Sequence, residues 1–189
     1  MIKLFLTDLD GVLTNGKYIV SMKRTKDVDV VPAACVTNIH QKITDTFLSR
    51  SFHTRDFHGF SLLQEQNILT GIITNADRDC IVEDQIARSK SHCMLFPGTS
   101  DKKEFVQRGF IDHGFNGIEY KWEDIAYIGD DLDDVELLKK VGFAACPADA
   151  EDEVIEVIKL LDDGCVLNRR GGEGCVREFI NLLLPNHAN

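Results

Sequence analysis

Two aspartates that directly follow a short apolar run are the feature that most constrains the fold. The run Leu4-Phe5-Leu6 leads through Thr7 to Asp8 and Asp10. A short apolar run of this kind is typical of a buried parallel strand, and parallel sheets bind ligands at the carboxyl ends of their strands. Residues two apart on an extended segment point the same way, so Asp8 and Asp10 can share one polar site. The alternative is that Asp-x-Asp merely opens a turn.

Length and composition restrict the class of protein. The 189 residues, 43% hydrophobic and 28% charged, predict a single globular domain over 1–189. The net charge of −10 argues against a nucleic-acid partner, which normally needs a basic surface. Six cysteines without Cys-x-x-Cys spacing indicate reduced thiols. No apolar segment is long enough for a signal peptide or a membrane span, so we expect a cytoplasmic protein without a membrane partner.

From Asp56 onward, strand-like and helix-like segments alternate. This alternation predicts a three-layer, doubly wound α/β fold with a parallel sheet. The expected strands after Leu4–Leu6 are Gly71–Thr74, Cys93–Phe96, Ile125–Gly129 and Phe143–Cys146, and the expected helices are Gly59–Gln66, Arg78–Ser89, Lys102–His113 and Val135–Val141.

The region of about residues 15–55 is irregular and predicts a β-hairpin flap. Tyr18–Val20 and Asp27–Val31 flank the charged turn Lys23–Lys26, and Asp45–Thr54 has the composition of a second extended segment. Only 27 residues separate Thr74 from Lys102. We therefore expect no large cap domain.

Polar residues follow four of the expected strands. They are Asp8 with Asp10, Thr74 with Asn75, Lys102, and the acidic run Asp130 to Asp134. Because the carboxyl ends of parallel strands meet at one edge of the sheet, we expect these groups to converge. Each has a simpler explanation alone: a helix cap, an exposed lysine, or acids at a helix N-terminus.

Together these groups match the needs of phosphoryl transfer through an aspartyl phosphate. Asp8, Asp130 and a backbone carbonyl are oxygen ligands that suit Mg²⁺. Thr74 offers a hydroxyl and Lys102 a point charge for the phosphoryl oxygens. The sequence therefore predicts a carboxylate nucleophile beside a magnesium site.

The ordered motifs Asp8–Val12, Thr74, Lys102 and Gly129–Asp131 resemble those of the haloacid dehalogenase superfamily of phosphatases. The segment Arg169–Glu178 is similar to the C-terminal signature of its sugar-acid phosphatase branch, and His53–Gly59 also resembles that branch. One departure is Asn75-Ala76, where the family usually has Gly followed by Arg or Glu. A second is the stretch 17–50, which is longer than the family's hairpin.

The resemblance implies roles for individual residues. It implies that Asp8 is the nucleophile, that Asp10 is the acid and base, and that Thr74, Asn75 and Lys102 bind the phosphoryl group. It further implies that Asp134 orients Lys102. The metal ligands that it implies are Asp8, Asp10 through its carbonyl, Asp130 and, at the first or second shell, Asp131.

The resemblance also implies an assembly and a substrate. It implies a homotetramer in which flaps pack centrally and a C-terminal tail, about 165–189, reaches a neighbour's site. The substrate would be a small phosphorylated sugar acid, with a nonulosonate 9-phosphate favoured by Glu173 over octulosonate 8-phosphate. Two alternatives stay open: a non-catalytic oligomerisation or regulatory domain, and a phosphatase for another phosphate ester. The residues expected to bind the sugar are Arg55, Arg170, Glu173 and Arg177.

Overall fold

The computed structural model describes residues 1–17, 19–23, 45–78 and 80–184. Residues 1–17 and 51–189 form one compact unit and residues 18–50 form another, and each is described here by itself. None of the helices in the described ranges has the length and apolar character that a membrane crossing demands.

The larger unit contains one six-stranded sheet in which every pairing is parallel. The strand order is β5-β4-β1-β6-β7-β8, so the first strand in the chain is central. The expected doubly wound α/β fold is therefore confirmed, with a sixth strand that the sequence reading did not include. The strands are β1 (Leu4–Thr7), β4 (Leu69–Ile73), β5 (Met94–Phe96), β6 (Ile125–Ile128), β7 (Phe143–Cys146) and β8 (Gly164–Val166).

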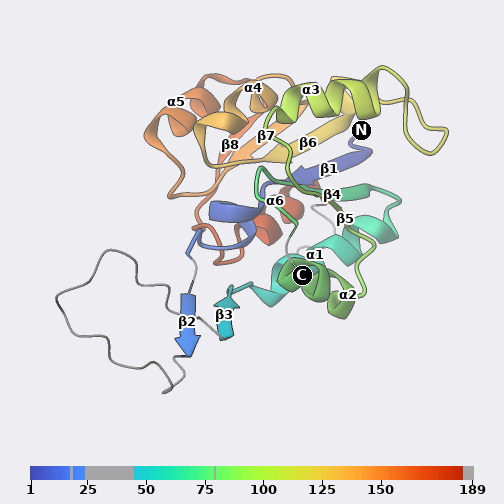
Figure 1. Ribbon diagram of the computed structural model, residues 1–189. Helices are drawn as coiled ribbons and strands as arrows, with labels where there is room; N and C mark the ends of the chain where they lie inside the picture. Colours follow the sequence, from blue (N-terminus) through green and yellow to red (C-terminus); the bar gives the residue numbers. More distant parts are fainter. Residues whose placement is uncertain (18, 24–44, 79, 185–189) are drawn as a thin grey trace, which may run out of the picture. The chain divides into compact units, whose positions relative to one another are not determined.

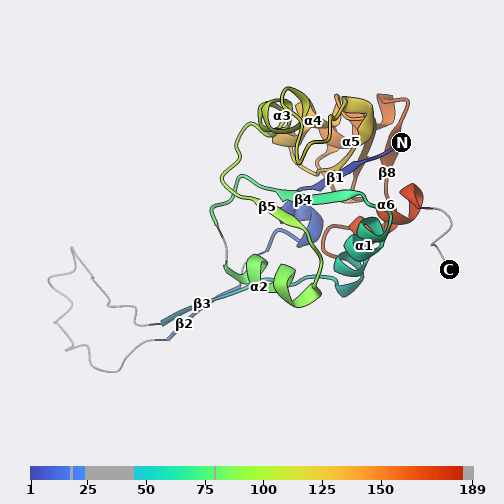
Figure 2. The same ribbon diagram turned by 90° about the vertical axis from the view of Figure 1, so that its right-hand side faces the viewer.

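Helices cover both faces of this sheet, as Figures 1 and 2 show. On one face lie α1, α2 and α6, and on the other lie α3, α4 and α5. The helices are α1 (Thr54–Glu65), α2 (Cys80–Ser89), α3 (Lys102–Val106), α4 (Val135–Leu138), α5 (Asp152–Leu160) and α6 (Cys175–Leu183), with shorter helical turns at Leu9–Leu13, Gln107–Ile111, Trp122–Asp124 and Leu132–Asp134.

The alternation of side chains in β1 explains why the sheet is buried on both faces. All four residues of β1 are buried. Phe5 packs in the core under α1 and α6, where it contacts Phe60 and Phe179. Leu4 and Leu6 point to the opposite core under α3, α4 and α5. A strand that is apolar on both faces is typical of a sheet between two helical layers.

Several predicted boundaries were wrong. Helix α1 begins at Thr54 rather than Gly59, because the Nδ1 atom of His53 accepts a hydrogen bond from Arg55 N and caps the helix. The helix expected over 102–113 is α3 followed by a wider turn at Gln107–Ile111, in which Asp112 N bonds to Gln107 O. Helix α4 is only one turn long.

The C-terminal segment expected to be a tail is largely part of the core. Strand β8 extends the sheet beside β7, and α6 packs against α1. The residues of α6 that are buried in the same core as β1 are Cys175, Val176, Phe179 and Ile180. Residues 185–189 lie outside the described part of the chain.

The smaller unit contains an antiparallel pair, β2 (Ile19–Lys23) and β3 (Asp45–Ser49), with Ile19 opposite Ser49 and Lys23 opposite Asp45. A hairpin-like pair was predicted here, but its second strand is the segment 45–49. Lys23, expected in a turn, is a strand residue. The predicted strand Asp27–Val31 lies outside the described residues.

Candidate active site

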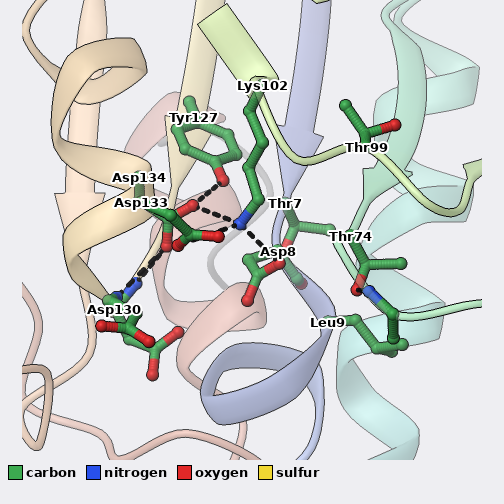
Figure 3. Close-up of polar contacts among 12 residues, drawn as sticks. Thr7, Asp8, Leu9, Thr74, Thr99, Lys102, Tyr127, Asp130, Asp133 and Asp134 are labelled. Atoms are coloured by element: carbon green, nitrogen blue, oxygen red, sulfur yellow. Dashed lines mark hydrogen bonds and ion pairs between the residues drawn. The ribbon is translucent and has the colours of Figure 1, made fainter.

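A buried lysine is the centre of the polar cluster at the carboxyl ends of β1 and β6. Lys102 begins α3 and is 2% exposed. Its Nζ atom lies 2.9 Å from Asp8 Oδ1, 2.5 Å from Asp134 Oδ1 and 3.6 Å from Asp133 Oδ1 (Figure 3). A buried ammonium is stable only with such partners. The structure therefore excludes the ordinary exposed lysine that was the alternative interpretation of this position.

Asp134 holds that lysine in place. It is completely buried, and its Oδ1 atom accepts hydrogen bonds from Lys102 Nζ and from the hydroxyl of Tyr127. Its Oδ2 atom accepts from the backbone N–H groups of Asp130 at 2.9 Å and Asp131 at 3.2 Å. Both oxygens are therefore occupied by donors, and the contact with Lys102 is the orienting contact that we expected.

The cluster carries more negative than positive charge. Burial, with a smaller contribution from the Asp134 charge, raises the pKa of Asp8 to about 7 although Lys102 opposes the change. Burial and the neighbouring carboxylates, Asp8 foremost, raise the pKa of Asp130 to about 8. Burial alone would lower the pKa of Lys102, but Asp8 and Asp134 outweigh it and raise the pKa above its usual value. One ammonium thus faces several carboxylates, which is the charge balance of a cation site.

The carboxylates fit a divalent cation. Ligand atoms of Asp8, Asp130 and Asp134 all lie within 4.8 Å of one another. Asp130 Oδ1 is buried and has no hydrogen-bond partner in the described part of the chain, whereas both oxygens of Asp134 are already occupied. An orphaned carboxylate oxygen of this kind needs a ligand to offset its desolvation. Asp8 and Asp130 are therefore the side chains best placed to bind a metal.

Gly11 allows the loop after β1 to approach Asp130. Its φ angle is +85°, and a Cβ atom at this position would lie 1.9 Å from Asp130 Oδ2. Only glycine combines that backbone conformation with so short an approach. The Asp8–Gly11 segment and Asp130 can thus share one small site.

The loop after β4 brings Thr74 to the same edge, opposite Asp8 in Figure 3. Thr74 is 3% exposed, and its Oγ1 atom accepts a hydrogen bond from Ala76 N at 3.1 Å. Its backbone is fixed by bonds from Thr74 N to Phe96 O and from Thr99 N to Thr74 O. Asn75 beside it is exposed. The hydroxyl is therefore held at the site by the chain itself.

Asp10 lies two residues further along the same loop. The Thr14 hydroxyl donates to Asp10 Oδ1 at 3.1 Å and also contacts Leu9 O at 3.3 Å. Thr14 itself is buried. This hydroxyl restricts the orientation of the Asp10 carboxyl, so the two carboxylates of the Asp-x-Asp motif have different surroundings.

The glycine-rich segment before α6 packs directly on the loop of Asp8 and Asp10. Gly172 N donates to Val12 O at 2.8 Å, and Cys175 Sγ donates to the same oxygen at 3.3 Å. A Cβ atom on Gly171 would lie 1.8 Å from Gly11 O. This approach is possible only without a side chain, which explains the glycine pair.

Asp149, which follows β7, accepts two hydrogen bonds from the glycine-rich segment before α6. Its Oδ1 atom accepts from Gly171 N at 2.8 Å, and its Oδ2 atom accepts from Arg170 Nε at 3.1 Å. Glu151 N, two residues on, donates to Asp130 O at 3.0 Å. The loop after β7 therefore contacts both the glycine-rich segment that packs on the Asp8–Asp10 loop and the loop that carries Asp130.

The remaining residues that were expected at the site, a metal-ligand candidate and four candidates for binding the sugar, lie in different surroundings. Asp131 is exposed, and its Oδ1 atom accepts from Leu132 N at 2.6 Å. Arg170 pairs with Asp149, Glu173 is exposed, and Arg55 and Arg177 line a separate cavity. The structure thus brings together Asp8, Lys102, Asp130 and Thr74. Of the four residues expected to bind the sugar, Arg55 and Arg177 line one other cavity, whereas Arg170 and Glu173 do not line it.

Three contacts in or beside this cluster were not predicted from the sequence. Tyr127 reads as an ordinary core residue of β6, because only the folded chain shows its hydroxyl at Asp134. The contact of Thr14 with Asp10 could have been predicted, since Thr14 lies four residues after Asp10 in the same loop. The contacts of Asp149 could not have been predicted, because its partners are about twenty residues further along the chain.

Comparison with known proteins gives relatives along the length of this chain. It is 29% identical over 183 residues to the 3-deoxy-D-manno-octulosonate 8-phosphate phosphatase of Salmonella typhi, covering 97% of this chain and 79% of that one. It is 23% identical over 185 residues to N-acylneuraminate cytidylyltransferase B of Danio rerio, but spans only 36% of that protein. No protein-family model matches the sequence.

Solved structures give the same neighbours. The octulosonate 8-phosphate phosphatase of Yersinia pestis superposes with a TM-score of 0.70 at 26% identity, covering 97% of this chain and 81% of that one. The cobalt-bound Haemophilus influenzae phosphatase gives 0.65 at 26% identity, with 97% and 88% covered. A Legionella pneumophila structure described as a haloacid dehalogenase subfamily III A hydrolase gives 0.68 at 27%, with 97% and 82% covered.

Proposed function

Because the chain is a phosphoric monoester hydrolase of the haloacid dehalogenase superfamily, we propose that it is a Mg²⁺-dependent phosphatase of a small phosphorylated sugar acid. The observation that carries this proposal is the pairing of Asp8 with buried Lys102, beside the Asp130 oxygen that has no hydrogen-bond partner among the described residues. A nucleophile, a phosphate-binding cation and a metal-ligating oxygen are what phosphoryl transfer to a carboxylate requires.

In the proposed mechanism Asp8 attacks phosphorus in line and becomes an aspartyl phosphate. Asp10 begins protonated and gives its proton to the departing sugar oxygen. It then removes a proton from the water that hydrolyses the intermediate. The Thr14 hydroxyl, which contacts Asp10 Oδ1, keeps the carboxyl in position for both steps.

Two further groups bind the transferring phosphoryl group. Lys102 supplies a positive charge, and its two short contacts with Asp8 and Asp134 leave it little freedom to move. Thr74 supplies a hydroxyl, with Asn75 beside it. Bound through Asp8, Asp130 and the Asp10 carbonyl, with Asp131 as a further candidate ligand, Mg²⁺ would neutralise negative charge on the phosphate. The cobalt in the Haemophilus relative supports a divalent ion here.

The substrate class comes from the named relatives. The Salmonella and Yersinia relatives are octulosonate 8-phosphate phosphatases, and the Danio relative is an N-acylneuraminate cytidylyltransferase. We propose a phosphorylated 3-deoxy sugar acid, with a nonulosonate 9-phosphate ahead of the octulosonate 8-phosphate. Exposed Glu173 lies next to Gly172, which contacts the catalytic loop, so this residue is the proposed discriminator.

Asp8→Asn is the direct test of the mechanism. We expect phosphate release from a panel of sugar-acid and other phosphate esters to fall by about 10⁴-fold or more, because an amide cannot form the intermediate. Removal of divalent metal should silence the wild type, and Mg²⁺ should restore it. The exposed Asp162→Asn serves as a matched control and should keep full activity. Full activity of Asp8→Asn would exclude the mechanism.

The substrate choice needs a separate comparison. The kcat/KM values for a nonulosonate 9-phosphate and for the octulosonate 8-phosphate are measured in wild type and in Glu173→Ala. We expect a preference for the nine-carbon ester that Glu173→Ala reduces by about tenfold. Preference for the eight-carbon ester, unchanged by Glu173→Ala, would refute this assignment and leave the hydrolase mechanism intact.

A second candidate is a non-catalytic accessory domain. The match to about a third of the Danio cytidylyltransferase favours it, because that relative is much longer than this chain. The presence of Asp8, Asp10, Lys102 and Asp130 together favours hydrolysis instead. Absence of turnover across the whole ester panel with Mg²⁺ would establish the accessory role.

We also propose a cytoplasmic homotetramer. The open edge of the sheet leaves the intermediate accessible to bulk water unless other chains cover it. Closed symmetric oligomers are common among soluble enzymes. Light scattering at micromolar concentration should give a tetramer mass, and a monomer would refute this assembly.

A further inference from the structure

A cavity of about 320 Å³ lies where the first turns of α1 and α6 meet, apart from the cluster around Lys102. The two helices pack side by side, as Figures 1 and 2 both show. The cavity is cationic although the whole chain is acidic. Its lining residues are Arg55, His58, Arg169, Arg177, Glu178 and Asn181.

The one acidic side chain of this lining already has donors. Glu178 Oε1 accepts from Asn168 N at 3.0 Å and Asn168 Nδ2 at 2.7 Å, and Oε2 accepts from Arg169 N at 2.9 Å. Arg55 and Arg169 make no ion pair within the part of the chain that the structure describes. Their guanidinium groups therefore line a cavity in which Glu178 is the one carboxylate among the lining residues.

The side chain of Arg177, which lines this cavity, is oriented by a hydrogen bond. Its Nε atom donates to Asn181 Oδ1 at 2.8 Å, which orients the guanidinium along α6. Its backbone N–H donates to Asp56 Oδ1 at 2.7 Å. Asp56 is completely buried beneath the helix junction, so it contributes a single negative charge at most. The three guanidinium groups outnumber the two carboxylates, Asp56 and Glu178.

We propose that this cavity binds the oxyanion of a small molecule, a carboxylate or a phosphate. Guanidinium groups pair with two oxygens of such a group at once, and three arginines line this one cavity. The volume is at the lower end of small-molecule sites. It accommodates one small anion or the acidic end of a larger ligand.

The cavity is joined to the catalytic loop through the chain. Arg169 and Arg177 flank the segment in which Gly172 N bonds to Val12 O. A bound anion would draw Arg55 of α1 and Arg169 together and stiffen that segment. Occupation of this cavity is therefore positioned to influence the loop of Asp8 and Asp10.

Titration of metal-free protein tests this site without the catalytic centre. The protein is treated with a chelator and dialysed free of it, because the chelator is itself an anion. Inorganic phosphate, sulfate and a phosphate-free nine-carbon sugar acid are titrated separately by calorimetry. We expect saturable binding of at least one of them with a dissociation constant on the order of 1 mM. Binding here does not depend on the proposed hydrolysis.

A double variant and a matched control locate the binding. Arg55→Gln with Arg169→Gln should weaken binding by about tenfold, because two charged donors are lost. Arg88→Gln with Arg108→Gln makes the same change in net charge at exposed arginines on α2 and near α3, and should leave binding unchanged. Circular dichroism checks that both variants are folded.

The three ligands distinguish the source of the oxyanion. Binding of phosphate or sulfate that depends on Arg55 and Arg169 indicates a free inorganic anion. Binding of only the sugar acid, with the same dependence, indicates the carboxylate of a substrate or product. Absence of saturable binding by all three, or equal binding by both double variants, overturns the proposal.

Discussion

Two completely buried aspartates, Asp134 and Asp56, show opposite ways of placing a carboxylate inside this fold. Asp134 accepts from a lysine, a tyrosine and two backbone N–H groups. Asp56 accepts from Arg177 N through Oδ1, and its Oδ2 atom has no partner within the described residues. Burial accordingly raises the pKa of Asp56 to about 7, with Arg169 and Arg177 opposing the change only in part.

The difference shows what each site requires. A carboxylate that fixes a buried lysine must be rigid, and both oxygens of Asp134 accept hydrogen bonds. A carboxylate at a helix junction can remain partly satisfied, because it needs only to bind one N–H group. Partial satisfaction makes the α1–α6 junction sensitive to pH. The following variants test this contrast, beginning with the largest expected effect.

Lys102→Met should be the most damaging change. It leaves Asp134 and Asp8 buried without their cation, which costs about 3–5 kcal/mol of unfolding free energy. Chemical denaturation and phosphate release measure stability and activity, and we expect activity to be lost. Lys103→Met, at the half-exposed neighbour, should change stability by less than about 0.5 kcal/mol. Equal effects would remove Lys102 from the centre of the site.

Asp56→Asn should change how stability depends on pH. The pKa of Asp56 in the folded protein, about 7, is above the ordinary value of an aspartate. Wild type therefore loses stability as pH rises from about 4 to 7, and its stability is constant above pH 7. An amide does not ionise. Denaturation of both proteins should show a difference in unfolding free energy that grows over this window and favours the variant by about 4 kcal/mol at pH 8. A constant difference from pH 5 to 8 would contradict the assignment.

Tyr127→Phe should remove one of the four donors of Asp134. We expect a loss of about 1–2 kcal/mol in unfolding free energy, because three donors remain. The matched control is Tyr120→Phe, since buried Tyr120 makes no hydroxyl hydrogen bond with described residues. Thermal denaturation of the two variants compares them. A smaller loss for Tyr127 than for Tyr120 would show that Asp134 does not need the hydroxyl.

Asp149→Ala should have the smallest effect on stability, about 1 kcal/mol, because the side chain is exposed. The variant removes the hydrogen bonds from Gly171 N and Arg170 Nε, so the glycine-rich segment that packs on the Asp8–Asp10 loop becomes less rigid. We expect kcat to fall by about tenfold with little change in KM. The exposed Asp162→Ala is the control for a general loss of charge. An unchanged kcat would show that these hydrogen bonds do not position the loop.

The parallel-sheet rule could be applied to the sequence because each key residue follows an apolar strand. It placed Asp8, Thr74, Lys102 and Asp130 at one edge, and the structure shows them there. Helix α6 was expected to belong to a C-terminal tail because the family resemblance implied one, although the spacing of Val176, Phe179 and Ile180 is that of a buried helix face. Tyr127 and Asp149 act through contacts that no local pattern encodes.

The central position of β1 has a consequence for biosynthesis. Leu4 pairs with Leu69 on one side and with Ile125 on the other, so this strand emerges from the ribosome well before either neighbour. The closing contact from Gly172 N to Val12 O joins segments even further apart. Until those partners are translated, an apolar strand with two open edges is exposed to other nascent chains. Production of this protein should therefore depend on chaperone capacity more than that of a helical protein of equal length.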